Sequence, residues 1–267
     1  MEFVKLVGSG NDFVVLDNLN GKIRDGGRLA KLMCHRKFGV GADGLLLLER
    51  SNKADFRMRI FNPDGSEAEM CGNGLRCLTR FISLKHFSSK RRLTVETRAG
   101  IHETFILGAS IRTSMRIVGK PNLNQKITVD GHQLTVHFIN TGVPHAVILV
   151  DEIVAVQVSR QGPQVRFHPF FQPAGTNVDW IEITGKNTLK IRTYERGVEA
   201  ETLSCGTGTV AAAIVAYLLN QVNPPVSVLA ASGEKLNVDF SPDLEKIFLE
   251  GRTSFPFSGT WLLGKKK

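Results

Sequence analysis

Two short segments of this 267-residue chain match each other, Cys71-Gly-Asn-Gly74 and Cys205-Gly-Thr-Gly208. Each segment opens an apolar stretch. In Leu75–Leu84 the apolar side chains recur at helical spacing, whereas Val210–Leu219 is apolar nearly all round and must be buried. The pattern therefore predicts two helices, each with a cysteine at its first turn.

The similarity extends upstream of both cysteines. Arg59-Ile-Phe-Asn62 precedes the first, and Arg192-Thr-Tyr-Glu195 precedes the second. Further upstream, Gly10–Val14 resembles Gly175–Asp179, and each leads into an alternating strand pattern. Three matches in the same order predict two halves with one architecture.

The rest of the chain is rich in strand patterns separated by turn signals. Strands are expected at Leu45–Leu48, Phe56–Phe61, Leu93–Thr97, Ser110–Val118, Gln133–Ile139, Ala146–Val150, Asp179–Ile183 and Val226–Leu229. Besides the two helices after the cysteines, helices are expected at Arg28–Phe38 and Asp151–Val158. Many strands with few helices are typical of the α+β class.

We place a domain boundary near Gly119-Lys120-Pro121. This gives an N-terminal lobe at 1–118 and a C-terminal lobe at 119–256, with the tail 257–267 expected to pack on the first lobe.

Composition indicates an ordinary soluble protein, with 42% hydrophobic and 22% charged residues. The net charge of +9 is spread along the chain, so it favours a solvated basic surface over a nucleic-acid site. No apolar stretch approaches the roughly 20 residues that span a bilayer, and the N-terminus lacks the apolar core of a secretory signal. We therefore expect a cytoplasmic protein that binds neither nucleic acid nor membrane.

The four cysteines are too few for a disulfide scaffold and show no zinc-ligand spacing, so no metal site is expected. Cys34 and Cys77 lie within helix-like apolar patterns and are expected to be buried, inert thiols. A formal G-x-G-x-x-G occurs at Gly39, Gly41 and Gly44. A helical pattern precedes it and a strand follows, which reverses the order of a dinucleotide-binding motif, so a nicotinamide site is excluded.

The other two cysteines have the setting of chemically active groups. A thiol at the first turn of a helix faces unpaired backbone N–H groups and the positive end of the helix dipole, which are expected to lower its pKa. The same N–H groups can bind a carboxylate. Two such sites that face one carbon could remove a proton from one side and return one to the other, which inverts its configuration without a cofactor.

Four segments resemble the signatures of the diaminopimelate epimerases: Lys5–Asp17, Arg59–Cys77, Thr141–Val147 and Arg192–Gly208. The resemblance implies two lobes of mixed β-barrel type, each with a central helix. It also implies a cofactor-independent isomerase that interconverts LL- and meso-2,6-diaminopimelate, for lysine and peptidoglycan-precursor biosynthesis.

Site residues follow from the resemblance position by position. It implies that Cys71 and Cys205 are the acid and base, and that His145 and Glu195 bias their pKa values. The implied substrate-binding residues are Asn11, Asn62, Gly72, Asn73, Asn177, Glu195, Arg196, Gly206 and Thr207. Phe257 stands where the family often has an aromatic residue in a dimer contact, which implies a homodimer.

This chain departs from some family members at two positions, with Gly44 where they have Gln and Val143 where they have Asn. Because neither residue offers a side-chain hydrogen bond, slow turnover of glutamate is expected beside a preference for diaminopimelate. The paired cysteines also fit a related racemase of glutamate, proline or hydroxyproline, an alternative that the Asn-Asp-Phe and Tyr-Glu-Arg-Gly segments disfavour. A thiol oxidoreductase that uses Cys71 and Cys205 as a redox pair is an alternative from another class of enzyme, and the absence of a C-x-x-C pair disfavours it.

Overall fold

The computed structural model describes residues 1–262. The chain forms two compact units: Met1–Thr113 together with the chain from Gly251 onward, and Ser114–Glu250. These divisions fall at 113/114 and 250/251, where 118/119 and 256/257 were expected. Residues 263–267 of the expected C-terminal tail lie outside the described residues. Within residues 1–262, no helix combines the length and apolar character needed to cross a bilayer.

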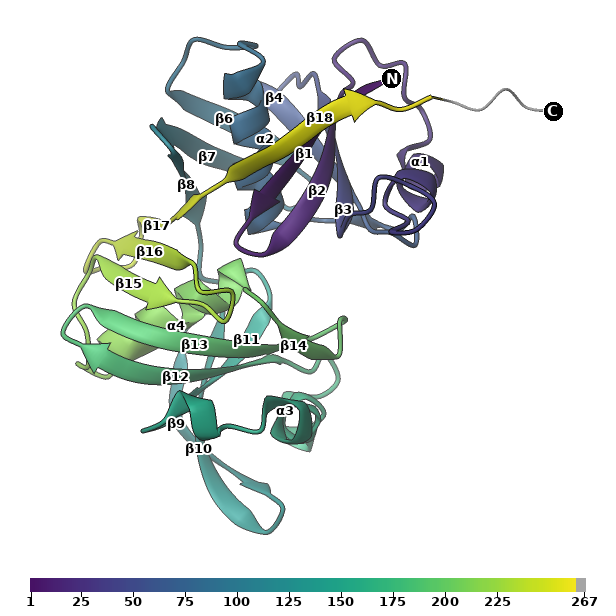
Figure 1. Ribbon diagram of the computed structural model, residues 1–267. Helices are drawn as coiled ribbons and strands as arrows, with labels where there is room; N and C mark the ends of the chain where they lie inside the picture. The colour runs from purple at the N-terminus through teal and green to yellow at the C-terminus, as the bar shows by residue number, and fades with distance from the viewer. Residues whose placement is uncertain (263–267) are drawn as a thin grey trace. The chain divides into compact units, whose positions relative to one another are not determined.

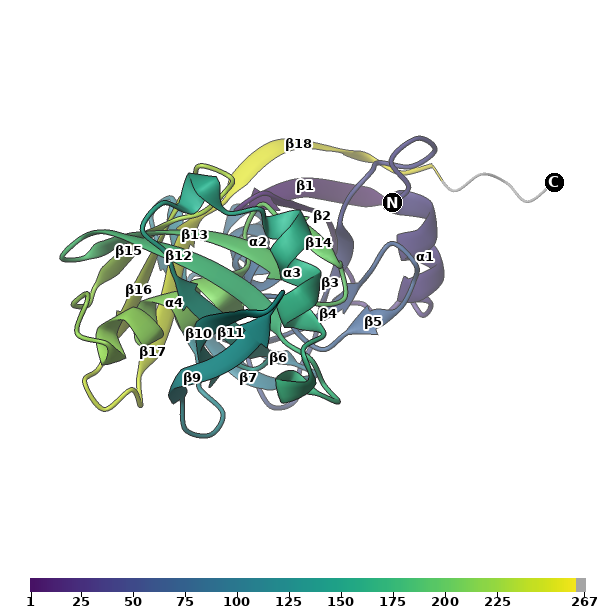
Figure 2. The ribbon, with the colours of Figure 1, turned by 90° about the horizontal axis from the view of Figure 1, so that it is seen from below.

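The first unit is a mixed sheet wrapped around one helix. Its strand order is β18–β1–β2–β3–β4–β6–β7–β8, with the short β5 beside β4. Neighbours are antiparallel except β2 with β3, joined through α1, and β4 with β6, joined through α2. The yellow β18 runs beside the purple β1 in both Figure 1 and Figure 2. The bounds are β1 Glu2–Gly8, β2 Asn11–Asp17, α1 Gly26–Met33, β3 Gly44–Glu49, β4 Phe56–Phe61, β5 Glu67–Ala68, α2 Gly72–Leu84, β6 Arg92–Thr97, β7 Gly100–Leu107, β8 Ser110–Met115 and β18 Ser254–Thr260.

The second unit repeats this topology. Its order is β9–β10–β11–β12–β13–β15–β16–β17, with the short β14 beside β13. The parallel pairs are again β11 with β12, joined through α3, and β13 with β15, joined through α4. The bounds are β9 Asn122–Val129, β10 His132–Asn140, β11 Pro144–Leu149, η1 Ile153–Ala155, α3 Val158–Arg166, η2 Pro169–Phe171, β12 Asn177–Gly185, β13 Thr188–Glu195, β14 Ala200–Thr202, α4 Gly206–Leu218, β15 Val226–Leu229, β16 Lys235–Phe240 and β17 Ile247–Arg252. The expected α+β class, with one central helix in each half, is confirmed.

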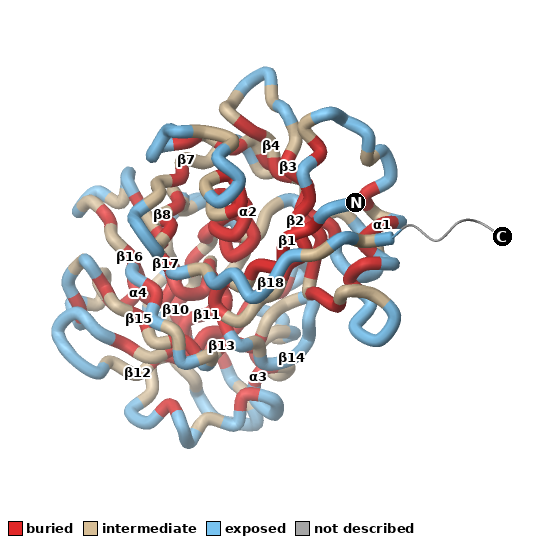
Figure 3. Tube along the Cα trace, turned by 45° about the horizontal axis from the view of Figure 1, so that its top comes forward, coloured by how far each residue is buried: buried red, intermediate tan, exposed pale blue. Residues whose placement is uncertain are grey.

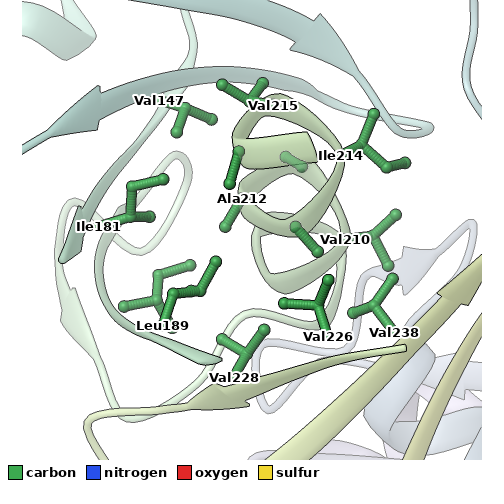
Figure 4. Close-up of a cluster of buried hydrophobic side chains, with 14 of the residues drawn as sticks. Val147, Ile181, Leu189, Val210, Ala212, Ile214, Val215, Val226, Val228 and Val238 are labelled. Atoms are coloured by element: carbon green, nitrogen blue, oxygen red, sulfur yellow. The ribbon is translucent and has the colours of Figure 1, made fainter. Parts of the chain in front are cut away.

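Each central helix is buried because the strands of its own unit surround it. In the second unit, Val210 and Ile214 of α4 pack among valine, leucine and isoleucine side chains from the neighbouring strands (Figure 4). The small residues Ala211–Ala213 let those strands approach α4 closely. Because strands cover the helix on every side, its residues are apolar on every side. In the first unit, buried residues likewise line α2 and the strands beside it (Figure 3).

The run Leu45–Leu48 in β3 is continuously apolar because the strand has two buried faces. Leu46 and Leu48 pack with α2, whereas Leu45 and Leu47 pack with α1 on the opposite face. Since successive strand residues point to opposite faces of the sheet and both faces are buried, every residue of the run must be apolar. The glycine-rich segment therefore connects the end of α1 to a buried strand, in the order expected from the sequence.

Two expectations were wrong in detail. Gly10–Val14 enters β2, whose topological counterpart is β11, whereas Gly175–Asp179 enters β12, the counterpart of β3. That third match is therefore not part of the repeat, although the matches at the cysteines and at β4 and β13 are. The helix expected at Asp151–Val158 lies instead at Val158–Arg166, because Pro163 and Gly162 masked the helical pattern there.

Truncation of the α4 core tests this packing. We expect Ile214→Ala to lower the free energy of unfolding by about 3 kcal/mol, since the side chain is fully buried and leaves a cavity. Urea denaturation followed by circular dichroism measures the change. The control Val154→Ala removes an 80% exposed side chain of the same unit and should change stability by less than about 0.5 kcal/mol. Equal effects of the two variants would contradict the central position of α4.

Candidate active site

Cys71 is the N-cap residue of α2. Its backbone is extended, and its Sγ atom accepts a hydrogen bond from the backbone N–H of Gly74 at 3.4 Å. A Cβ atom at Gly72 would meet nothing within 4 Å, so this glycine leaves the space at the helix N-terminus open to a ligand. Gly74 has a different role, because its missing side chain lets Leu46 pack against the helix.

Polar side chains beside Cys71 form one chain of hydrogen bonds. Asn73 Nδ2 donates to Asn11 Oδ1 at 2.6 Å, and Asn11 Nδ2 donates to Asp43 at 3.2 Å. The fully buried Arg76 donates to Asn73 Oδ1 at 2.7 Å and to Ser9 at 2.8 Å. The structure therefore brings together two of the expected amide ligands, Asn11 and Asn73.

The third amide expected in this unit is placed differently. Asn62 lies in the turn between β4 and β5, where its Nδ2 donates to Ser66 Oγ at 2.9 Å. Gly44 begins β3, and a Cβ atom there would lie 3.2 Å from the Phe61 carbonyl oxygen and 3.3 Å from the Phe13 ring. A longer side chain at Gly44 would therefore require its neighbours to move. Phe257, on β18, is 46% exposed and packs edge-on against Phe3.

Cys205 is the N-cap residue of α4 and is buried, unlike the half-buried Cys71. Its Sγ atom lies 3.3 Å from Thr207 Oγ1. Thr207 Oγ1 lies in turn 3.0 Å from His145 Nε2, and His145 Nδ1 lies 2.7 Å from Asp179 Oδ2. His145 is thus connected to the cysteine through a hydroxyl group rather than directly.

The expected lowering of the Cys205 pKa is wrong. Burial raises the pKa of this thiol well above its ordinary value, and the carboxylates of Glu195 and Asp179 raise it further. Hydrogen bonds from Thr207 and the Gly208 N–H oppose this effect but are weaker. Cys205 is therefore held as a neutral thiol, the protonation state of a general acid.

The other expected residues of the second unit lie at the ends of β11, β12 and β13. Asn177 begins β12 beside His145 of β11, and its amide nitrogen donates to Pro144 O at 3.0 Å. The backbone N–H of Arg196 donates to Asn177 Oδ1 at 2.8 Å. Burial raises the pKa of the Glu195 carboxyl, although Thr202 and His145 oppose the shift. Val143 is half-buried in the loop before β11.

Cys34 and Cys77 are buried, as expected. Burial raises the pKa of the Cys34 thiol to about 12, so it remains protonated at neutral pH.

Matched ion pairs at the two cysteine helices escaped the sequence analysis. Arg59 binds both oxygens of Glu67 at 2.8 Å, and Arg192 binds both oxygens of Glu201 at 2.7 and 2.8 Å. Each pair joins a long strand to the short strand that precedes the cysteine, so each fixes the entry to its helix. The repeat at Arg59 and Arg192 could be seen in the sequence. Their glutamate partners could not be identified there, because the two separations along the chain differ, 8 residues to Glu67 and 9 residues to Glu201.

Asp179 also escaped the sequence analysis. It lies at the centre of the buried strand β12 and is fully buried. An ionisable residue within an apolar strand is a signal of a functional group, and that signal was available in Asn177–Ile183.

The chain is similar to known proteins over nearly its full length. The family model described as diaminopimelate epimerase matches residues 3–115 and 137–255. The chain belongs to this family. It is 44% identical over 272 residues to the diaminopimelate epimerase of Aquifex aeolicus, with 97% of each chain covered. It is 40% identical to that of Methanocella arvoryzae, with 97% of this chain and 96% of the relative covered.

Solved structures of lower identity share the fold of this diaminopimelate epimerase family member. A PhzF-family phenazine biosynthesis protein of Bacillus anthracis is 16% identical with a TM-score of 0.74, covering 98% of this chain and 99% of that one. A hydroxyproline epimerase of Agrobacterium vitis is 16% identical with a TM-score of 0.69, covering 97% and 91%. The chain is thus an isomerase that acts on a small molecule, and the sequence-based recognition of its family is confirmed.

The carboxyl group of Asp12, near the start of β2, gives a prediction of how the free energy of unfolding depends on pH. Burial acts to raise the pKa of Asp12, but hydrogen bonds and charge from Arg36 and Lys5 outweigh it and lower the pKa from 3.8 to about 2. Since the folded pKa lies below the unfolded one, this stabilisation is present above about pH 4 and is lost as pH falls toward 2. Asp12→Asn should therefore cost roughly 1–2 kcal/mol at pH 7, allowing for solvent screening.

Urea denaturation of wild type and Asp12→Asn at pH 7 and pH 2 measures this difference. The exposed carboxylate Asp17 at the far end of the same strand provides the control, and Asp17→Asn should change stability by less than about 0.5 kcal/mol at either pH. A deficit of Asp12→Asn that persists unchanged at pH 2 would contradict the role of the ionised carboxylate.

Proposed function

We propose that this protein interconverts LL- and meso-2,6-diaminopimelate without a cofactor, with Cys71 and Cys205 as the acid and base. The observation that supports this is the repeated motif itself. Both units place a cysteine at the N-cap of a central helix, followed by Gly72-Asn73 in one unit and Gly206-Thr207 in the other. One such site suits a nucleophile, whereas two of them suit proton removal and return at one carbon.

The reaction needs one thiolate and one thiol. A thiolate removes the α-hydrogen as a proton, and the bonding pair remains on the substrate as a carbanion delocalised into its carboxylate. The opposite thiol then gives its proton to the other face of that carbon, which leaves the second cysteine as the thiolate. Each turnover therefore exchanges the protonation states of the two cysteines.

The helix N-termini lower the barrier to this step. A thiolate is a weak base for an amino-acid α-hydrogen, so negative charge that builds on the substrate carboxylate must be stabilised. Backbone N–H groups at the first turn are oriented before the reaction begins and bind that carboxylate without reorganisation. The open space at Gly72 suits this role. Asn11, Asn73 and Asn177 would hold the amino and carboxylate groups, with Arg196 beside Asn177.

Two further properties follow from the proposal. A pair of working thiols needs a reducing compartment, which favours the cytoplasm. All seven residues of β18 except Gly259 are exposed, and Phe255 and Phe257 add apolar surface to this strand. We therefore propose that this strand contributes to a homodimer contact.

Replacement of either cysteine tests the function. Cys71→Ala and Cys205→Ala should each lower kcat for diaminopimelate epimerisation by more than about a thousand-fold, because the reaction needs an acid and a base together. The double variant should be little worse than either single one, as is typical of groups that act as a unit. Chiral chromatography of LL-diaminopimelate incubated with each variant measures the rate.

Cys34→Ala is the matched control, since it removes a buried thiol outside the site and should keep wild-type kcat within about three-fold. The proposal fails if either Cys71→Ala or Cys205→Ala keeps more than about a tenth of wild-type kcat, a loss of only ~1.4 kcal/mol in barrier height.

A further inference from the structure

A continuous chain of hydrogen bonds leads away from Cys205 into the interior of the second unit. It passes from Sγ to Thr207 Oγ1 at 3.3 Å, from there to His145 Nε2 at 3.0 Å, and from His145 Nδ1 to Asp179 Oδ2 at 2.7 Å. It ends where Thr193 Oγ1 donates to Asp179 Oδ1 at 2.7 Å. The side chains of His145 and Asp179 have no exposed surface. Thr207 is half-buried, so the path begins near the surface at the thiol and ends in the interior, with every distance in hydrogen-bond range.

The donors in this chain can be assigned from its ends. The Asp179 carboxylate only accepts hydrogen bonds, so His145 carries a proton on Nδ1, and in the neutral ring Nε2 is then an acceptor. The Thr207 hydroxyl must then donate to Nε2. The remaining lone pairs of Thr207 Oγ1 face Cys205, and they accept the S–H bond of the thiol. In this arrangement of donors, Cys205 is a thiol and the His145 ring beside Thr207 is neutral.

We propose that Thr207 relays a proton between Cys205 and His145, with Asp179 as a positioning residue, so that this buried thiol can act as a base as well as an acid. The inference rests on the proposed function, because one of the two directions of epimerisation requires Cys205 as the base. In the relay the thiol proton moves to Thr207 Oγ1 while the hydroxyl proton moves to His145 Nε2. The products are a thiolate and an imidazolium, and no proton enters from or leaves to solvent.

The need for a relay follows from the surroundings of the thiol. Four ionisable groups meet here, each on a different element: His145 on β11, Asp179 on β12, Glu195 on β13 and Cys205 on α4. Both carboxylates oppose a lone thiolate, and burial opposes it as well. An imidazolium formed one hydroxyl away supplies the compensating positive charge, and Asp179 stabilises that imidazolium at Nδ1.

Two features show that the geometry is specific to this unit. A Cβ atom at Gly208 would lie 2.4 Å from Asp179 Oδ1, so the glycine is needed for the carboxylate to approach the first turn of α4. In the first unit the position of Thr207 is occupied by Asn73, whose amide is bound to Asn11 and Arg76. The two cysteines therefore have different polar neighbours at the same position of the repeated topology.

Substitution of Thr207 separates the relay from packing. Thr207→Val keeps the shape of the side chain and removes the hydroxyl. With kcat measured from LL- and from meso-diaminopimelate, it should lower kcat at pH 7 by more than about ten-fold in the direction that uses Cys205 as the base. The deficit should shrink as pH rises, because hydroxide can then remove the thiol proton without the relay. Thr207→Ser restores the hydroxyl and should return kcat to within about three-fold of wild type with the wild-type pH profile.

The matched control is Thr209→Val, which removes another buried hydroxyl of α4, one that bonds the Cys205 carbonyl oxygen outside the relay. It should keep the wild-type shape of the pH profile. Asp179→Asn should show the same pH-dependent deficit as Thr207→Val. If it does not fold, the Thr207 variants decide alone. A Thr207→Val profile that is parallel to wild type at every pH would overturn the relay.

A second measurement does not depend on activity. In ¹⁵N-histidine NMR spectra of the full chain without substrate, the His145 ring, identified by its loss in His145→Gln, should be the Nδ1–H tautomer. Asp179→Asn should change that tautomer. An Nε2–H ring in wild type would overturn the proposed donor order. Failure of wild type to epimerise diaminopimelate would instead contradict the proposed function, while this spectrum still tests the hydrogen-bond network.

Discussion

The first turn of a buried helix carries backbone N–H groups that the helix itself cannot satisfy. In both units of this protein that turn begins with a cysteine, and the sheet around the helix fixes where the cysteine lies. A helix that is buried on every side cannot rotate or shift without loss of packing, so the N–H groups have fixed directions.

The same frame carries different polar surroundings in its two copies. Beside Cys71, the amides of Asn11 and Asn73 are fixed by a fully buried arginine. Beside Cys205, a threonine, a histidine and an aspartate form a chain of hydrogen bonds. An epimerase has no need for identical bases, because its substrate is chiral and presents a different face to each. The repeated topology thus provides two helix N-termini, and the residues around each one differ.

The sequence predicted the parts of the fold that depend on local patterns. The two helices after the cysteines, the strand at Phe56–Phe61 and the doubly buried Leu45–Leu48 all have apolar spacing that identifies them. The third repeat match failed because Asn11 and Asn177 begin different strands of the common topology, and strand pairing is set by distant segments. The raised pKa of Cys205 could not be predicted either, because Asp179 and Glu195 approach the thiol only once the sheet has formed.

The proposed function requires two thiols that act on opposite faces of one carbon, and isotope exchange tests this requirement most directly. Wild-type protein is incubated with LL-diaminopimelate in deuterated water without cofactors, and early samples are separated by chiral chromatography and analysed by mass spectrometry. The account predicts meso product with one solvent deuterium at the inverted carbon, while recovered LL substrate remains largely protonated. Equal early labelling of substrate and product would contradict it, because a single base that exchanges with solvent labels both.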